Sequence, residues 1–205
     1  MVVRTRSRDV FINCPFDDAY RPMFHAIVFA VIRSGFRPRC ALETDDGARN
    51  RMGLITDIIE ECRYGIHDIS RTEPDGDPPL PRFNMPLELG LFLGARRYGE
   101  EPQKKKRCII LDRERYRFQR FVSDIAGQDI HSHDGQPNRC IEEVATWLRD
   151  QSRARTVPGG RAIAAEFVTF ERELSAICRA RGLEPDELTF GDFTTLVEEY
   201  LTAVA

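Results

Sequence analysis

The 205-residue chain lacks a strong excess of either charge, because 30 Lys and Arg residues stand against 33 Asp and Glu residues and the net charge is −3. This balance gives no general electrostatic attraction to nucleic acid or to an anionic membrane surface. The chain also has no long apolar run, so it predicts neither a signal peptide nor a membrane span. We therefore expect a cytoplasmic protein that acts without nucleic acid and away from membranes.

Paired metal-binding motifs are missing as well. The six cysteines include no C-x-x-C pair, and most of them stand in apolar segments. This pattern is typical of reduced core residues and not of a disulfide frame or a zinc site. His131 and His133 have a spacing that metal ligands use on a strand, but the sequence offers no third ligand beside them. The sequence thus indicates no metal site.

Strands and helices alternate along the first three quarters of the chain. Short apolar runs predict strands, and apolar residues at three- and four-residue steps predict the helices between them. The predicted strands are 10–14, 39–42, 66–69 and 108–111, with an edge strand within 118–130. The predicted helices are 18–33, 49–63, 84–97 and 138–149, with Met52 among the inward residues of the second. The proline-rich segment 74–81 predicts a loop. This repetition predicts an α/β fold, with a flavodoxin-like doubly wound parallel sheet over residues 8–150.

Only helical patterns follow the break at Gly159-Gly160. A helix at 162–181 and a shorter one at 193–204 predict a C-terminal helical appendage at 160–205. The first of these helices has an apolar stripe of Ile163, Phe167, Phe170, Leu174 and Ile177. Such a stripe is too hydrophobic to face water along a whole helix, so it must pack on the sheet domain or on a second subunit. We expect a homo-oligomer or a partner complex to which this appendage contributes contacts.

Two carboxylates point to a ligand site. Asp68 ends the third strand, and Glu88 interrupts the otherwise apolar start of the helix at 84–97. Ligands of open α/β sheets bind where strand ends and helix starts meet. Asp68 is costly as a core residue unless it is hydrogen-bonded, which favours a role toward the ligand. Glu88 feels the positive end of the helix dipole, which favours its charged form, although it can also simply cap free amides there.

Other candidate residues surround these two acids. Asn84 is a good N-cap residue whatever else it does. Asp17 and Asp18 follow the first strand, and either can cap the first helix or contact a ribose hydroxyl. An aromatic residue such as Phe16 can shape a base pocket, but it is as often a core residue. The predicted substrate contacts around the crevice are Cys14, Pro15, Phe16, Asp17 and Met85.

A third acid and several basic residues have weaker assignments. Glu43 follows the second strand, where dinucleotide-binding folds place a ribose-binding acid, but the chain has no G-x-G-x-x-G loop. We include Glu43 among the predicted substrate contacts. Arg49 and Arg51 near the next helix can hold phosphate or form a solvated face. The run Lys104-Lys105-Lys106-Arg107 is typical of a solvated loop.

The order of the site residues resembles a known family. Ile66-His-Asp68 and Asn84-x-x-x-Glu88-Leu-Gly, with the opening Phe11-Ile-Asn-Cys-Pro-Phe-Asp-Asp18, are similar to nucleoside 2-deoxyribosyltransferases and the related Toll/interleukin-receptor-like (TIR-like) NAD hydrolases. The resemblance covers about residues 8–150. It implies N-glycosidic bond chemistry with Glu88 as the catalytic glutamate, Asp68 as the acid that ends the third strand and Asn84 as the amide that opens the helix.

The resemblance also sets the expected function. Transferases of the family often have an acid six residues before the glutamate, where this chain has Arg82, so hydrolysis of a phosphate-bearing nucleotide is favoured over transfer. A close carboxylate can stabilise or trap the oxocarbenium-like state of such a reaction. We expect an enzyme that cleaves NAD or a related nucleotide without a cofactor, as an effector in bacterial antiphage defence or a toxin system. The alternative is a non-catalytic module that binds a nucleotide signal and regulates a partner protein.

Overall fold

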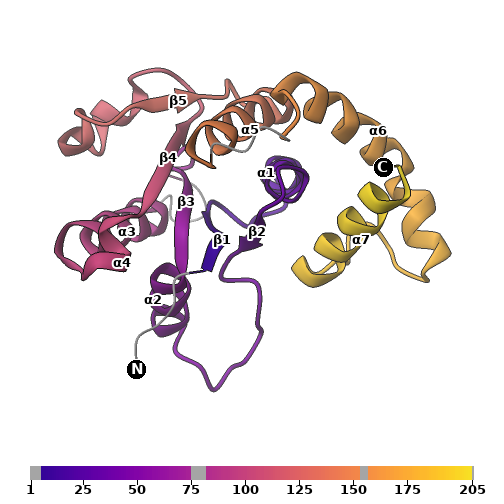
Figure 1. Ribbon diagram of the computed structural model, residues 1–205, viewed down its shortest axis with the longest axis horizontal. Helices are drawn as coiled ribbons and strands as arrows, with labels where there is room; N and C mark the ends of the chain where they lie inside the picture. Colours follow the sequence, from indigo (N-terminus) through magenta and orange to yellow (C-terminus); the bar gives the residue numbers. More distant parts are fainter. Residues whose placement is uncertain (1–5, 75–81, 153–156, 205) are drawn as a thin grey trace.

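A computed structural model describes residues 6–74, 82–152 and 157–204 of the chain. Five parallel strands form one sheet in the order β2-β1-β3-β4-β5 (Figure 1). The strands are β1 (Arg6–Asn13), β2 (Arg37–Arg39), β3 (Cys62–Asp68), β4 (Arg107–Asp112) and β5 (Ile130–Ser132). The predicted α/β class and the flavodoxin-like strand order are thereby confirmed. Of the loop predicted at 74–81, only Pro74 belongs to the described residues.

Helices cover both faces of the sheet (Figure 1). They are α1 (Arg21–Arg33), α2 (Arg51–Glu61), α3 (Asn84–Tyr98), α4 (Glu101–Lys104), α5 (Pro137–Ser152), α6 (Gly160–Ala180) and α7 (Phe190–Ala203), with short 3₁₀ turns η1 (Arg117–Arg120) and η2 (Ser123–Ile125). Helices α1 and α5 pack on one face, and α2 and α3 pack on the other. This is the doubly wound arrangement expected when helices cross over between parallel strands.

The alternation of side chains along β1 explains why both faces are apolar. Val10 and Ile12 point into the core shared with α1 and α5, whereas Phe11 points toward α2 and α3. Successive residues of a strand face opposite sides of a sheet, so a strand buried on both sides needs a continuous apolar run. The same holds in β4, where Ile109 and Leu111 join the first core and Ile110 joins the core beneath α3.

The C-terminal helices pack on the sheet domain. Helix α6 lies against α5 and α1, and α7 lies against α1. Of the predicted stripe, Ile163, Phe167 and Phe170 are fully buried, while Leu174 and Ile177 are partly buried. These side chains belong to the same hydrophobic cluster as the α1 and α5 residues. Of the two alternatives for this stripe, packing on the sheet domain is therefore the one observed, and oligomerisation stays a prediction.

Two expectations about the second strand and the second helix are wrong. The strand predicted at 39–42 lies earlier, at Arg37–Arg39, and pairs with Asp9–Phe11 of β1. A proline at position 38 disfavours a strand prediction for this segment, but it is tolerated in the structure because β2 is an edge strand. Met52, predicted to face inward from the second helix, is 42% exposed. The buried face of α2 is instead formed by Leu54, Ile55, Ile58 and Ile59.

Lys106 also departs from the sequence expectation. It is fully buried, whereas the basic run that contains it predicted a solvated loop. Its ammonium donates to the backbone oxygens of Ile59 and Cys62 and lies 4.8 Å from the centre of the Phe92 ring. Burial lowers its pKa to about 8. Lys106 thus joins the end of α2 to the start of β4, which is a contact that no local sequence pattern encodes.

Gly65 of β3 is required for a close approach of two rings. A Cβ atom at this position would lie 2.7 Å from Nε2 of His67 and 2.9 Å from ring atoms of Phe92. We expect Gly65→Ala to destabilise the fold by about 2 kcal/mol and to lower the Tm by about 4–8 °C. Gly53→Ala in α2 is the matched control, because its nearest new contact is at 3.9 Å and alanine favours a helix. Equal Tm values for the two variants in a thermal melt would refute this account of Gly65.

Candidate active site

The carboxyl ends of β1 and β3 meet the start of α3 at one edge of the sheet. Asn13, the last residue of β1, is buried, and its Nδ2 donates to the backbone oxygen of Met85 at 2.8 Å. The same Nδ2 lies 3.0 Å from Nδ1 of His67. An amide nitrogen has two hydrogens, so it can serve both partners at once. Asn13, which the sequence did not single out, therefore ties the first turn of α3 to the strand ends.

His67 is a neutral member of this edge. Burial, together with the positive charge of Lys106, lowers its pKa to about 3. Its Nδ1 faces a donor on Asn13, which places the ring proton on Nε2. Its side chain is fully buried, so the ring has no exposed surface for a substrate. We therefore treat His67 as a structural residue.

Asp68 is at the centre of a buried hydrogen-bond network. Its Oδ2 accepts from the hydroxyl of Tyr20 at 2.5 Å and lies 2.9 Å from Nε2 of His133, and its Oδ1 accepts from the backbone N–H of Ser70 at 2.7 Å. Burial raises the pKa of this carboxyl, but the hydrogen bonds outweigh burial and hold it below the ordinary value. Asp68 is fully buried and both oxygens are occupied. This geometry favours a positioning role over contact with a substrate, and the catalytic role stays a prediction.

Glu88 has a different environment. It is the fifth residue of α3, beyond the first turn, and it is half-buried. Burial raises its pKa to about 7, against the opposing effect of the nearby Arg51. The expectation that the helix start favours its charged form is therefore wrong, because the dipole effect fades within the first turn. Among the described residues, no hydrogen bond or ion pair of Glu88 is found, so the capping alternative has no support.

Cations lie on two sides of the strand ends. Arg51, near the start of α2, acts electrostatically on Glu88 and is not engaged in an ion pair within the described part of the chain. Asp17 accepts from Arg82 at 3.2 Å, lies 3.4 Å from Arg71, and accepts from the backbone N–H of Tyr20 at 3.1 Å. Asp17 thus joins the loop after β1 to the loop after β3. Arginine side chains suit phosphate groups, and the phosphate role of Arg51 stays a prediction.

The other predicted contacts are distributed around this edge. Cys14 and Pro15 are buried, Phe16 is half-buried, and Met85 is buried with its backbone oxygen bound to Asn13. Burial, with a contribution from Asp68 and a smaller one from Glu88, raises the pKa of the Cys14 thiol well above its ordinary value. Asn84 is exposed and is the first residue of α3, whereas Phe83 is the N-cap residue. The expectation that Asn84 caps the helix is therefore wrong.

Glu43 is bound elsewhere. Its Oε1 accepts from Nε of Arg39 at 2.5 Å and from the backbone N–H of Cys40 at 3.2 Å. Arg39 also contacts Asp9 and Glu61, which makes an ion-pair cluster beside β2. Glu43 shares a groove with this cluster and with α7, and none of the other predicted site residues lines that groove. Its role as a substrate contact stays a prediction without geometric support.

The two histidines of the 131–133 segment face different partners. Nδ1 of His131 lies 2.7 Å from Glu143, and Nε2 of His133 faces Asp68. Within residues 6–74, 82–152 and 157–204, no group of three His, Cys, Asp or Glu side chains is placed to hold a metal ion. Tyr20 and His133, like Asn13, join the site through long-range contacts. Only the unusual His-Ser-His spacing marked His133 in the sequence.

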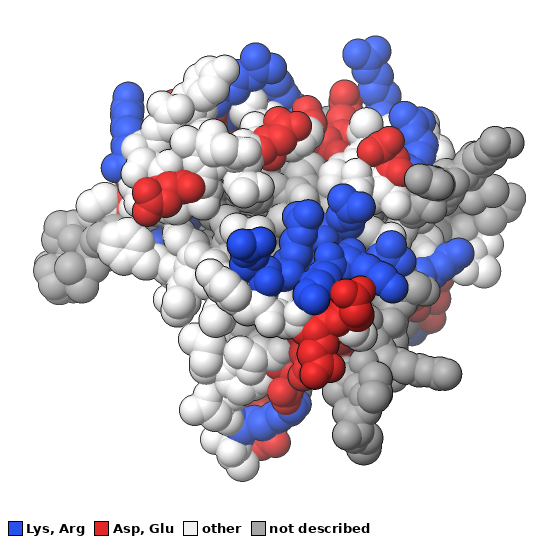
Figure 2. All heavy atoms as spheres, turned by 60° about the vertical axis from the view of Figure 1, so that its left-hand side comes forward, with Lys and Arg blue, Asp and Glu red and all other residues white. Residues whose placement is uncertain are grey.

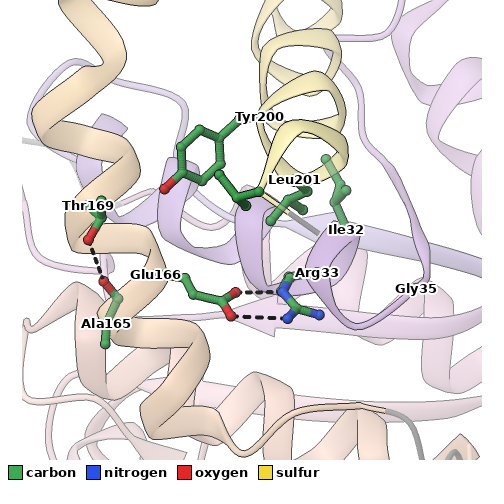
Figure 3. A pocket seen from close by; sticks show the side chains of 9 residues that line it. Ile32, Arg33, Gly35, Ala165, Glu166, Thr169, Tyr200 and Leu201 are labelled. Atoms are coloured by element: carbon green, nitrogen blue, oxygen red, sulfur yellow. Dashed lines mark hydrogen bonds and ion pairs between the residues drawn. The ribbon is translucent and has the colours of Figure 1, made fainter.

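A larger hollow lies away from these residues. It has a volume of about 560 Å³ between α1, α6 and α7, and its wall includes the double hydrogen bond from Arg33 to Glu166 (Figure 3). Tyr200 and Leu201 of α7 form its other side. None of the predicted site residues lines it, and its arginine is already paired. Volume alone therefore does not identify the site.

The surface charge is more structured than the net charge suggests. On the side of the molecule that carries α3 and α4, Lys and Arg side chains gather in one group, and Asp and Glu side chains form a band beside it (Figure 2). Such a group creates a local positive potential that a net charge of −3 does not reveal.

Comparison of the chain with protein-family profiles, curated proteins and solved structures finds no match in any of the three. The resemblance to the N-glycosidic enzymes therefore depends on the residues quoted above. Among the helices of the described ranges, none is long and apolar enough to cross a membrane.

Proposed function

We propose that this protein hydrolyses the N-glycosidic bond of NAD or a related nucleotide, with Glu88 as the reacting carboxylate. The supporting observation is the state of Glu88: it is half-buried, its pKa is raised to about 7, and it has no hydrogen-bond partner among the described residues. Such an acid lowers stability without forming a structural contact. Acids of this kind are concentrated at functional sites.

The chemistry assigns each group a task. As the base leaves with the electron pair of the C–N bond, positive charge develops on the sugar, and the Glu88 carboxylate stabilises it or bonds to the anomeric carbon. Water then adds to that carbon, displaces the carboxylate if it has bonded there, and releases a proton to the solvent. Arg51 binds phosphate, and Asn84 lies at the exposed start of the same helix. Asp68 fixes the strand end through Tyr20, His133 and Ser70.

A nucleotide-sensing module is the second candidate. The cations around Asp17 would serve binding without reaction equally well. Helix α1 follows this loop directly and packs on α6 and α7, so a ligand at the loop has a physical connection to the C-terminal helices. In this candidate the helices would pass the signal to a partner or to a second copy of the chain.

Incubation of the purified chain with NAD, ATP, nucleosides and nucleoside monophosphates, followed by chromatography, separates the two candidates. The hydrolase proposal predicts a free base from at least one phosphate-bearing nucleotide and little from the matching nucleoside. Binding of a nucleotide by calorimetry without release of base would favour the sensing module. Neither binding nor base release by a folded chain would contradict both candidates.

A further inference from the structure

A small cavity lies between the loop after β1 and the beginning of α7. Its volume is about 140 Å³. Four parts of the chain form its wall: the first loop, helix α1, the loop after β2 and the segment that enters α7. The wall includes Phe16, Phe24, His25, Leu42, Phe190 and Phe193. The C-terminal helices thus contribute directly to a hollow beside the candidate site.

The wall of this cavity is built from rings that hold one another in place. Phe16 and Phe24 meet edge to face with centres 5.3 Å apart, and Phe24 lies 6.0 Å from Phe190. His25 stacks on Phe193 with centres 3.8 Å apart. Ring pairs with these separations restrict each other's orientation. The wall is therefore already arranged for a flat aromatic guest.

The polar groups of the wall are compatible with an uncharged or cationic ring. Burial, with the nearby Arg21, lowers the pKa of His25 to about 4, so His25 is neutral near pH 7 and offers one donor and one acceptor. The guanidinium of Arg21 is engaged by Asp18 and by the backbone oxygen of Asp186. Asp17 is engaged by Arg71 and Arg82. His25 is thus the wall residue best suited to read the edge of a heterocycle.

The size selects the guest. An apolar cavity of roughly 150 Å³ holds one benzene ring. A hollow of about 140 Å³ therefore has the volume that one six-membered heterocycle needs, and a fused purine would extend beyond it. Phe16 and Asp17, two of the predicted substrate contacts, line this hollow, which places it beside the candidate site.

We propose that this cavity is the subsite for a one-ring base, a pyridine or a pyrimidine, and that α7 supplies part of its wall. The assignment of the bound ring as the leaving base depends on the proposed function, whereas binding of the ring does not. The nucleotides that this chain cleaves are then those with a single-ring base at the scissile bond.

The test titrates nicotinamide, cytosine and adenine separately into the ¹⁵N-labelled full chain and follows the backbone amides of residues 188–193. We expect nicotinamide or cytosine to shift these amides, with affinity at least about tenfold above that of adenine. The stronger of the first two identifies the ring as pyridine or pyrimidine. Leu42→Trp should weaken this binding by about tenfold or more, because Leu42 lines the cavity and its 41% exposure lets a larger side chain enter without disturbing the core.

Val168→Trp is the control, since Val168 is 37% exposed on α6 and does not line the cavity. Binding that is unchanged in Leu42→Trp, adenine binding as tight as either one-ring base, or no shifts with any base would each overturn the proposal. Shifts with a one-ring base in a chain that releases no base from any nucleotide would support the cavity and contradict the hydrolase.

Discussion

Glu88→Gln is expected to slow the release of free base by about a hundredfold or more, which is roughly 3 kcal/mol of transition-state stabilisation. Glutamine keeps the size and half-buried position of the side chain but cannot neutralise a sugar cation. Substrate binding should remain, because the phosphate contacts are assigned to arginines. Single-turnover chromatography of the base, with binding measured by calorimetry, separates these two effects.

The same variant should be more stable than the wild type at alkaline pH. Burial raises the pKa of Glu88 in the folded chain to about 7, from an ordinary value of 4.5. Between pH 4.5 and 7 the folded chain binds more protons than the unfolded chain, so the free energy of unfolding of the wild type falls as pH rises. Above pH 7 the loss of stability from the buried charge is complete. Because partial exposure screens the charge, we expect Glu88→Gln to gain about 1–2 kcal/mol, or about 2–8 °C in Tm, at pH 8.

Glu101→Gln on α4 provides the matched control for Glu88. Glu101 is exposed, and its ion-pair contact is with Lys104 of the same helix at 3.5 Å. Neither its turnover nor its Tm should differ from the wild type. A Glu88→Gln protein with full activity would remove Glu88 from the mechanism. A lower Tm at pH 8 would instead show that the carboxylate has a structural partner.

Asp68→Asn is expected to destabilise the fold by about 3 kcal/mol, with a fall of about 6–12 °C in Tm. The amide group cannot fit either orientation. If its nitrogen replaces Oδ2 it faces Nε2 of His133, whose Nδ1 already accepts from the N–H of Gly135 at 3.0 Å. If it replaces Oδ1 it faces the N–H of Ser70. One buried donor is left unsatisfied in each case.

Tyr20→Phe gives the graded comparison, because it removes one donor from Asp68 and should cost only about 1 kcal/mol. The hydrogen bonds hold the pKa of Asp68 below its ordinary value. The carboxylate therefore contributes to the free energy of unfolding above the ordinary pKa, and this contribution is lost as pH falls through the lowered pKa. The difference in Tm between the wild type and Asp68→Asn should therefore narrow only in strong acid. Equal melting temperatures at pH 7 would contradict the network, and substrate contact would then regain support.

The fold follows from the sequence where local pattern and burial agree. The runs around Phe11, Ile66 and Ile109 are apolar on both sides, which is what a parallel sheet covered on both faces requires. The failures have local causes. Pro38 disfavours a strand at the position of the edge strand β2. Met52 fits the helical spacing of a buried face but lies on the exposed side of α2.

The candidate site was only partly predictable. Asp68 and Glu88 stand out because each is an acid in an apolar segment. Asn13 and Tyr20 do not, since their partners lie dozens of residues away in the sequence. His133 is marked only by its spacing from His131, which does not indicate its contact with Asp68. The raised pKa of Glu88 could not be predicted from the sequence either. It arises from burial by neighbouring segments and not from the position of Glu88 in the helix.

The pH dependence of base release by the wild type and by Glu88→Gln tests the central claim most directly. If the ionised carboxylate of Glu88 stabilises the sugar cation, the single-turnover rate should rise from pH 5 and level off above an apparent pKa of about 7. The residual rate of Glu88→Gln should lack this step. A wild-type rate without a transition near neutral pH, or the same transition in the variant, would contradict the assignment of Glu88 as the reacting carboxylate.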